Sequence, residues 1–117
     1  MTKHNKDIGA WGEEIAGKWL AERGYQIVAH DVRTPYGELD VIAKRGDVTI
    51  FIEVTKLTSS EDFFPEHNIT VRKREHMLAC ADHYASEKEI DLWQIDVMAI
   101  EGSPNSMPMI THFQNAV

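Results

Sequence analysis

Two apolar stretches, ELDVIAKR at residues 38–45 and VTIFIEV at residues 48–54, are separated by only Gly46 and Asp47. Stretches of this kind, joined by a two-residue link that contains glycine, are typical of a β-hairpin. This predicted hairpin carries most of the information in the chain, and the rest of the sequence is interpreted outward from it.

The hairpin places residues that are equally far from the turn opposite each other, so we expect Asp40 to face Glu53. Because strand side chains alternate between two faces, the same pairing sorts the other residues. The face that we expect to be the core side carries Leu39, Val41, Ala43, Ile50, Ile52 and Val54. The opposite face, which we expect to be acidic and half-buried, carries Glu38, Asp40, Glu53 and Thr55, with Ile42 and Phe51 nearer the turn.

Two carboxylates that lie directly across a hairpin repel each other, and burial adds to the cost. A cation that neutralises Asp40 and Glu53 would remove this cost. Mg²⁺ takes oxygen ligands and is often bound by one or two carboxylates together with water and substrate phosphate. A metal site is therefore one interpretation, and a solvated face paired with Arg33, Lys44 or Lys56 is the other.

The segments around the hairpin predict helices and strands in alternation. An amphipathic helix is expected over 5–23, where Ile8, Trp11, Ile15 and Trp19 recur at helical spacing, and Gly24 ends it. A strand follows from Tyr25, and a polar loop with Phe63 and Phe64 covers 57–68. A second long helix over about 69–88 and strands at 91–100 and 107–113 complete the chain.

Length and composition bound the kind of protein. The 117 residues, of which 43% are apolar, predict one domain spanning 1–117. The single cysteine, the absence of a secretory signal pattern, and the absence of an apolar run of about 20 residues predict a cytoplasmic protein without a membrane segment. The net charge of −7 argues against broad electrostatic capture of nucleic acid but leaves room for a local basic patch.

Six short stretches spread over nearly the whole chain resemble the YraN-like bacterial family of predicted endonucleases. This family is related to the archaeal Holliday-junction resolvases and to the restriction-endonuclease-like superfamily. The stretches are GEEIAGKWLAERGYQI at 12–27, GELDVIA at 37–43, IFIEV at 50–54, ITVRKRE at 69–75, IDV at 95–97 and THFQNAV at 111–117.

The resemblance implies an α/β fold of the restriction-endonuclease-like kind, with a central mixed β-sheet flanked by helices in the order αβββαββ. It also implies a site for Mg²⁺ or Mn²⁺ made by Glu13, Asp40 and Glu53, although the sequence does not decide whether Glu13 or Glu14 points inward. The implied substrate is DNA, including branched DNA, and the implied assembly is a homodimer.

The chain departs from the family at the strand that carries Glu53. The family usually has Glu-Val-Lys followed by Thr-Arg, whereas this chain has Thr55 at the lysine position, then Lys56, then Leu57. In such nucleases the lysine orients the attacking water or stabilises charge on the phosphate, which Thr55 cannot do. Lys56 would reach the same face only if a β-bulge shifted the register by one residue.

Other candidate sites lie on the second long helix and the strand after it. Arg72, Lys73 and Arg74, together with Arg33, are candidate contacts for nucleic-acid phosphates, or else a solvated helix start. His76, Cys80 and His83 share a helical stripe that superficially resembles a zinc site, with core packing of Cys80 as the favoured reading. Asp96 could support the metal site indirectly or pair elsewhere.

Three functions remain open at this point. The first is a metal-dependent endonuclease, with Asp40, Glu53, Glu13, Thr55 and Lys56 as the residues of its active site. The second is a DNA-binding or repair-accessory module that keeps the fold without cutting, which the Thr55 departure favours. The third is an interaction protein without nucleic acid, which docks through the Phe63–Phe64 loop.

Overall fold

A computed structural model of the chain describes the backbone of residues 3–57 and 63–117, with side chains described from Gly9 onward in these ranges. The side chain of Ile8 and residues 58–62 of the predicted polar loop lie outside the described part. The elements are α1 (Lys3–Glu22), β1 (Gln26–Thr34), β2 (Gly37–Arg45), β3 (Val48–Leu57), α2 (Pro65–Asn68), α3 (Val71–Glu87), β4 (Trp93–Glu101) and β5 (Met109–Phe113).

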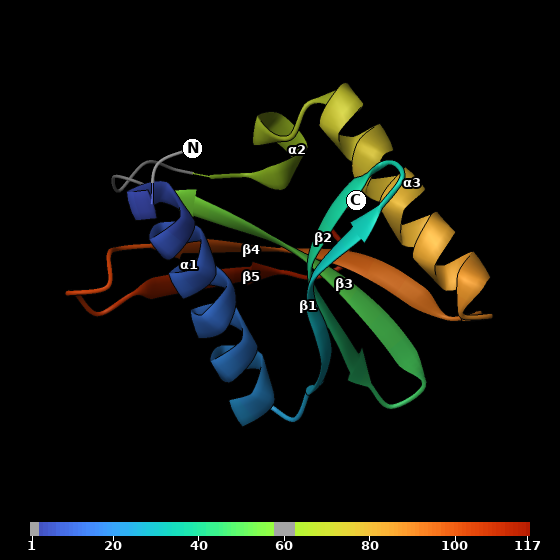
Figure 1. Cartoon of the computed structure of the whole chain (residues 1–117), viewed down its shortest axis with the longest axis horizontal. Helices are drawn as coiled ribbons and strands as arrows, with labels where there is room; N and C mark the ends of the chain where they lie inside the picture. The colour runs from blue at the N-terminus through green and yellow to red at the C-terminus, as the bar shows by residue number, and fades with distance from the viewer. Residues whose placement is uncertain (1–2, 58–62) are drawn as a thin grey trace.

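The five strands form one mixed sheet in the order β1-β2-β3-β4-β5 (Figure 1). Strands β3 and β4 are parallel, because the chain crosses from one to the other through α2 and α3, and the other neighbouring strands are antiparallel. The predicted restriction-endonuclease-like order αβββαββ is confirmed, with the single turn of α2 as an addition before α3.

The predicted β2–β3 hairpin is present with the expected turn. Gly46 has a φ of 60°, a left-handed conformation that glycine adopts without steric cost. The ladder runs from the Arg45–Val48 pair next to the turn to the Val41–Ile52 pair, with every residue in the expected register. The hairpin therefore brings Asp40 and Glu53 to the position directly beyond its last pair.

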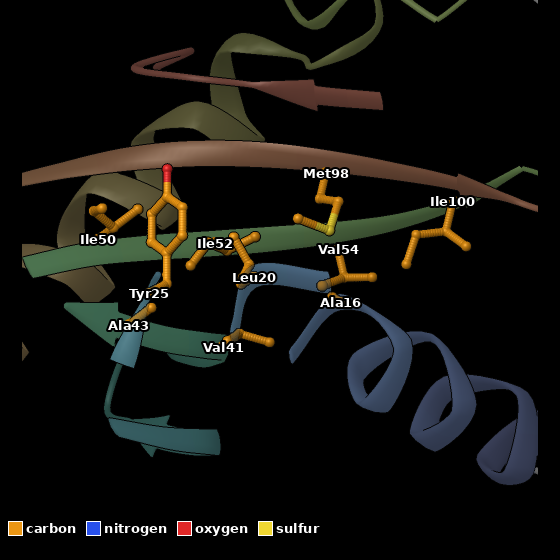
Figure 2. Packing of buried hydrophobic residues seen from close by; sticks show 10 residues of the cluster. All are labelled: Ala16, Leu20, Tyr25, Val41, Ala43, Ile50, Ile52, Val54, Met98 and Ile100. Atoms are coloured by element: carbon orange, nitrogen blue, oxygen red, sulfur yellow. The ribbon is translucent and has the colours of Figure 1, made fainter. Parts of the chain in front are cut away.

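A helix covers each face of the sheet, so the hairpin is buried on both sides. The first core cluster lies between α1 and the sheet, and Figure 2 shows its buried residues: Ala16 and Leu20 on α1, Tyr25 just before β1, and Val41, Ala43, Ile50, Ile52, Val54, Met98 and Ile100 on the strands that face the helix. The second lies under α3 and contains Leu39, Ile42, Phe51, Met77, Cys80, Ala81, Ala85, Ile95 and Val97.

Two predictions about the faces of the hairpin are wrong. Ile42 and Phe51, expected on a half-buried acidic face, have exposures of 0% and 1% because α3 packs on them. Leu39, expected on the same face as Val41, belongs to the cluster under α3 instead. The alternation fails between these two residues, at the point where Asp31 on the paired strand β1 has a φ of 52°.

No helix in the described ranges is long and apolar enough to cross a membrane.

Candidate acidic site at the open end of the β2–β3 ladder

The site lies where β2 leaves β3. Beyond the Val41–Ile52 pair the two backbones no longer pair with each other, and the side chain of Asp40 takes the place of a backbone partner. The backbone N–H of Val54 donates a hydrogen bond of 2.9 Å to Oδ2 of Asp40. The other oxygen of Asp40 and the carboxylate of Glu53 are then neighbours at the open end of the ladder.

The surroundings of Asp40 make the ionised form of its carboxyl group unfavourable. Burial, followed by the charge of Glu53, raises its pKa from 3.8 to about 6. The Val54 hydrogen bond and the charges of Lys56 and Lys73 act in the opposite direction and do not outweigh these effects. The pair of carboxylates that the hairpin predicted is therefore an electrostatically strained pair in the folded protein.

Glu13 of α1 approaches the site from the opposite face of the sheet. Burial, followed by the charges of Asp40 and Asp31, raises the pKa of Glu13 from 4.5 to about 7, against the opposing charge of Lys56. Its neighbour Glu14 is exposed and lies 3.6 Å from the ammonium of Lys18, one turn further along the helix. Glu13 is thus the inward-facing glutamate, a choice that helical periodicity left open.

Glu53 is paired with a lysine from the other helix. Nζ of Lys73, in the first turn of α3, lies 3.0 Å from Oε1 of Glu53, whose side chain is only 17% exposed. Burial alone would lower the pKa of Lys73, but the hydrogen bond and the charge of Glu53 raise it above its ordinary 10.5. Lys73 therefore carries its positive charge at every pH at which the protein would be studied.

The β-bulge that would turn Lys56 toward Glu53 is not present. Strand β3 pairs with β4 in unbroken register from Thr49–Trp93 to Leu57–Glu101. Lys56 lies on the α1 side, where its stem crosses the bare Cα of Gly12 so closely that a Cβ there would lie 3.0 Å from Cδ of the lysine. Lys56 cannot take the place of the family's lysine beside Glu53.

Thr55 lies on the α3 side of the sheet with Glu53. The two residues line a pocket of about 260 Å³ that is completed by Phe63, Asn68, Ile69, Thr70 and Lys73. The pocket adjoins the acidic pair and is walled by the start of α3, so a group bound in it would contact Glu53 and Lys73 together.

The donor set suits a hard divalent cation held by two carboxylates. Asp40 and Glu53 offer oxygen ligands side by side, and three carboxylates including Glu13 share the region with two ammonium groups, those of Lys56 and Lys73. Across residues 9–57 and 63–117, whose side chains are described, no three His, Cys, Asp or Glu side chains lie close enough to hold one ion. Asp40 and Glu53 are thus the neighbouring carboxylates, Glu13 lies close enough for the charge of Asp40 to raise its pKa, and the three-carboxylate site that the resemblance implied stays a prediction.

The candidate phosphate contacts are only partly brought together. Lys73 lies at the site and Arg72 is exposed beside it at the start of α3. Arg74 is half-buried, and Arg33 lies 3.3 Å from Glu38 in an exposed ion pair on the β1–β2 hairpin. Of the four residues, Lys73 is the one with a contact to the acidic pair.

The stripe of His76, Cys80 and His83 does not form a metal site in the described structure. Cys80 is buried against Gly37 and accepts a hydrogen bond of 3.4 Å from Oγ1 of Thr34. His83 lies 2.7 Å from Glu87, one turn further along α3. The core-packing interpretation of Cys80 therefore holds.

Asp96 serves a separate polar network rather than the acidic site. It is fully buried, and its Oδ2 lies 2.7 Å from Nε2 of His112 on β5. Its Oδ1 accepts hydrogen bonds of 2.8 Å from the side chain of Gln94 and from the backbone N–H of Asn115. The role of His112 was not predicted, and a histidine in the last strand was the only signal of it in the sequence.

The two phenylalanines of the predicted loop have different surroundings. Phe63 packs on the cluster under α3, with its ring centroid 6.0 Å from that of Phe113. Phe64 is 47% exposed and precedes α2. Only Phe64 remains accessible as a docking group.

Comparison with known proteins matches nearly the same part of the chain as the motifs. The model of the uncharacterised protein family UPF0102 matches residues 12–100. A UPF0102 protein of Treponema pallidum (strain Nichols) is 38% identical over 109 residues, which are 89% of this chain and 85% of the relative. A relative from Desulfitobacterium hafniense (strain Y51) is 34% identical over 103 residues, which are 86% of this chain and 85% of the relative. A relative from Syntrophotalea carbinolica is 31% identical over 118 residues, which are 99% of this chain and 95% of the relative.

Proposed function

This chain belongs to the uncharacterised protein family UPF0102, and on that premise we propose that it is a divalent-metal-dependent endonuclease that acts on DNA. The membership agrees with the YraN-like resemblance of its motifs. The observation that carries the proposal is the carboxylate of Asp40, which is held against Glu53 at a cost that raises its pKa to about 6.

Proteins retain such strained pairs where a cation or a reacting group uses them. Asp40 and Glu53 would hold Mg²⁺ or Mn²⁺, through the oxygens that the Val54 N–H and Lys73 leave accessible. A bound ion would supply a Lewis acid for a phosphate oxygen and would make a water molecule more acidic. The two residues therefore fix where on the sheet a phosphodiester would be attacked.

Glu13 is suited to exchange a proton at this place. Its pKa of about 7 leaves its carboxyl group partly protonated near neutral pH, which is the range in which general acids and bases are most effective. It shares the region with Asp40, whose charge raises its pKa. We assign to Glu13 the acceptance of a proton from the attacking water or its delivery to the leaving oxygen.

A second candidate function is DNA binding without cleavage. Two observations favour it: Thr55 stands where the family has its lysine, and Lys56 lies on the other face of the sheet, beside Gly12. A protein with this defect would keep the metal and the DNA contact while losing the stabilisation of charge in the transition state.

The experiment that separates these functions is cleavage of a linear duplex and a four-way DNA junction with Mn²⁺ or Mg²⁺. The wild-type protein is compared with Asp40→Asn, which removes a metal-binding charge, and with Asp82→Asn as an exposed control. An endonuclease cuts in the wild type and the control, and it loses cleavage in Asp40→Asn and in EDTA. Binding to either DNA without cleavage would establish the second function, and neither binding nor cleavage would refute both.

A further inference from the structure

Strand β3 shows where the family's lysine would act. Phe51, Glu53 and Thr55 alternate along the face that α3 covers, so a lysine at position 55 would extend from that face beside Glu53. Thr55 has no charge and is too short to take the place of that lysine. The side chain of Lys56 lies on the α1 side, over Gly12. The strand itself therefore brings no ammonium group to the α3 side of the acidic pair.

Helix α3 brings an ammonium group to the same place. Thr70 caps the helix, and its Oγ1 accepts a hydrogen bond of 3.1 Å from the backbone N–H of Lys73, which fixes where Lys73 starts. From there the side chain crosses to β3, and its Nζ lies 3.0 Å from Oε1 of Glu53. The ammonium group of Lys73 thus lies next to the Glu53 carboxylate, which a lysine at position 55 would also have approached.

The surroundings of Lys73 allow it to contact a second anion. An ammonium group has three N–H donors, of which Oε1 of Glu53 accepts one. The lysine side chain is 51% exposed, and with Thr55 and Thr70 it lines the pocket of about 260 Å³ beside Glu53. A phosphate oxygen in that pocket would accept a hydrogen bond from Nζ while the contact with Glu53 is kept.

We propose that Lys73 supplies to the DNA phosphate the ammonium group that position 55 lacks. This inference rests on the proposed function, because it concerns the same acidic pair. A purely structural role for Lys73, as an ion pair that joins α3 to β3, is the alternative. The two roles differ in what happens when the charge is removed and a lysine is supplied from the strand.

The experiment compares four variants with the wild-type protein. Lys73→Met removes the charge and keeps the length of the stem, and Arg72→Met is the matched control for loss of a neighbouring exposed charge. Lys73→Met combined with Thr55→Lys returns an ammonium from the strand, and Lys73→Arg keeps the positive charge if the double variant does not fold. Folding of each variant is checked by its melting temperature without metal.

Two readouts distinguish a phosphate contact from a structural one, and a third reports on the ion pair between Lys73 and Glu53. Lys73→Met should weaken metal-free binding of a duplex and lower the slope of log affinity against log salt by about 1. It should cut DNA about 100-fold more slowly or worse, and Thr55→Lys or Lys73→Arg should restore much of that loss. Its melting temperature should rise more with Mn²⁺ than that of the wild type, because no ammonium then competes for Glu53.

Lys73→Met that binds and cuts like Arg72→Met would overturn the inference. So would a folded double variant and a folded Lys73→Arg variant that both remain as inactive as Lys73→Met. Asp40→Asn in the same assays reports on the proposed function separately, through the loss of Mn²⁺ stabilisation and of cleavage. If the wild-type protein neither cuts DNA nor responds to Mn²⁺, the proposed function fails, and metal-free DNA binding still decides whether Lys73 contacts phosphate.

Discussion

Replacing Asp40 by asparagine should make the metal-free protein more stable at neutral and alkaline pH. The structure supports this expectation because the asparagine side chain keeps a carbonyl oxygen that can accept the hydrogen bond from the Val54 N–H. The substitution removes only the charge, which burial and Glu53 make unfavourable. A substitution at the centre of a proposed active site would then stabilise the fold, as expected where function requires strain.

The magnitude follows from the pKa of Asp40. A rise from 3.8 to about 6 corresponds to about 3 kcal/mol, at about 1.4 kcal/mol for each pH unit. Because the side chain is partly exposed and shares its field with Glu53, we expect a gain of about 1–3 kcal/mol. Between the two pKa values the folded state binds more protons than the unfolded state. The free energy of unfolding of the wild type therefore falls as the pH rises from about 3.8 to about 6.

The assay is urea unfolding in EDTA at several pH values between about 3 and 8, with Asp82→Asn as the exposed control. The two proteins should have nearly equal free energies of unfolding at the acid end, where Asp40 is protonated in both the folded and the unfolded wild type. Their difference should grow to its full value above about pH 6, near the folded pKa. If Asp40→Asn is less stable than the wild type across the whole range, the charge is favourable and the reasoning about the site is refuted.

Three further predictions concern other parts of the structure. The carboxyl carbon of Glu13 should titrate in NMR near pH 7, with a lower midpoint in Asp40→Asn, and a midpoint near 4.5 in the wild type would contradict the described burial. His112→Ala should cost about 3–5 kcal/mol in urea unfolding, because it leaves the buried carboxylate of Asp96 without its partner, and a loss below about 1 kcal/mol would show that the pair is dispensable. Phe51→Ala should cost about 3–5 kcal/mol because α3 packs on this ring, and a near-neutral result by thermal unfolding would mean that the α3 face is open.

The hairpin could be predicted from sequence because its signals are local. A glycine-containing turn between two apolar stretches sets the register, and the register brings Asp40 beside Glu53 at the end of the β2–β3 ladder. The alternation of faces could not be carried past Asp40, because nothing in the sequence indicates the left-handed conformation of Asp31 on the paired strand β1. Leu39 was misplaced for that reason.

The two sides of the site differ in how far they could be predicted. Motifs alone identified Glu13 as a candidate, but choosing it over Glu14 required the position of α1 on the sheet. The pairing of Lys73 with Glu53 joins residues from different elements, and no spacing in the sequence predicts it. The cap that Thr70 forms at the start of α3 was not predicted, and the direction of the helix over β3 is decided by the packing of the core.

The burial of both hairpin faces was missed although the sequence contained a sign of it. Ile42 and Phe51 are large apolar residues on the face that was expected to be acidic and half-buried. Strands that are covered on both faces are apolar on both, which is the pattern of a sheet flanked by helices. The acidic site is therefore confined to the end of the hairpin where this apolar floor stops.

The central claim, a divalent-metal site made by Asp40 and Glu53, is tested most directly by calorimetric titration of Mn²⁺ into the wild-type protein and into Asp40→Asn and Glu53→Gln. The account predicts Mn²⁺ binding in the wild type that is weakened at least about tenfold in each variant, a loss of about 1.4 kcal/mol or more in binding free energy. Equal affinity in all three proteins, or no binding in the wild type, would contradict it.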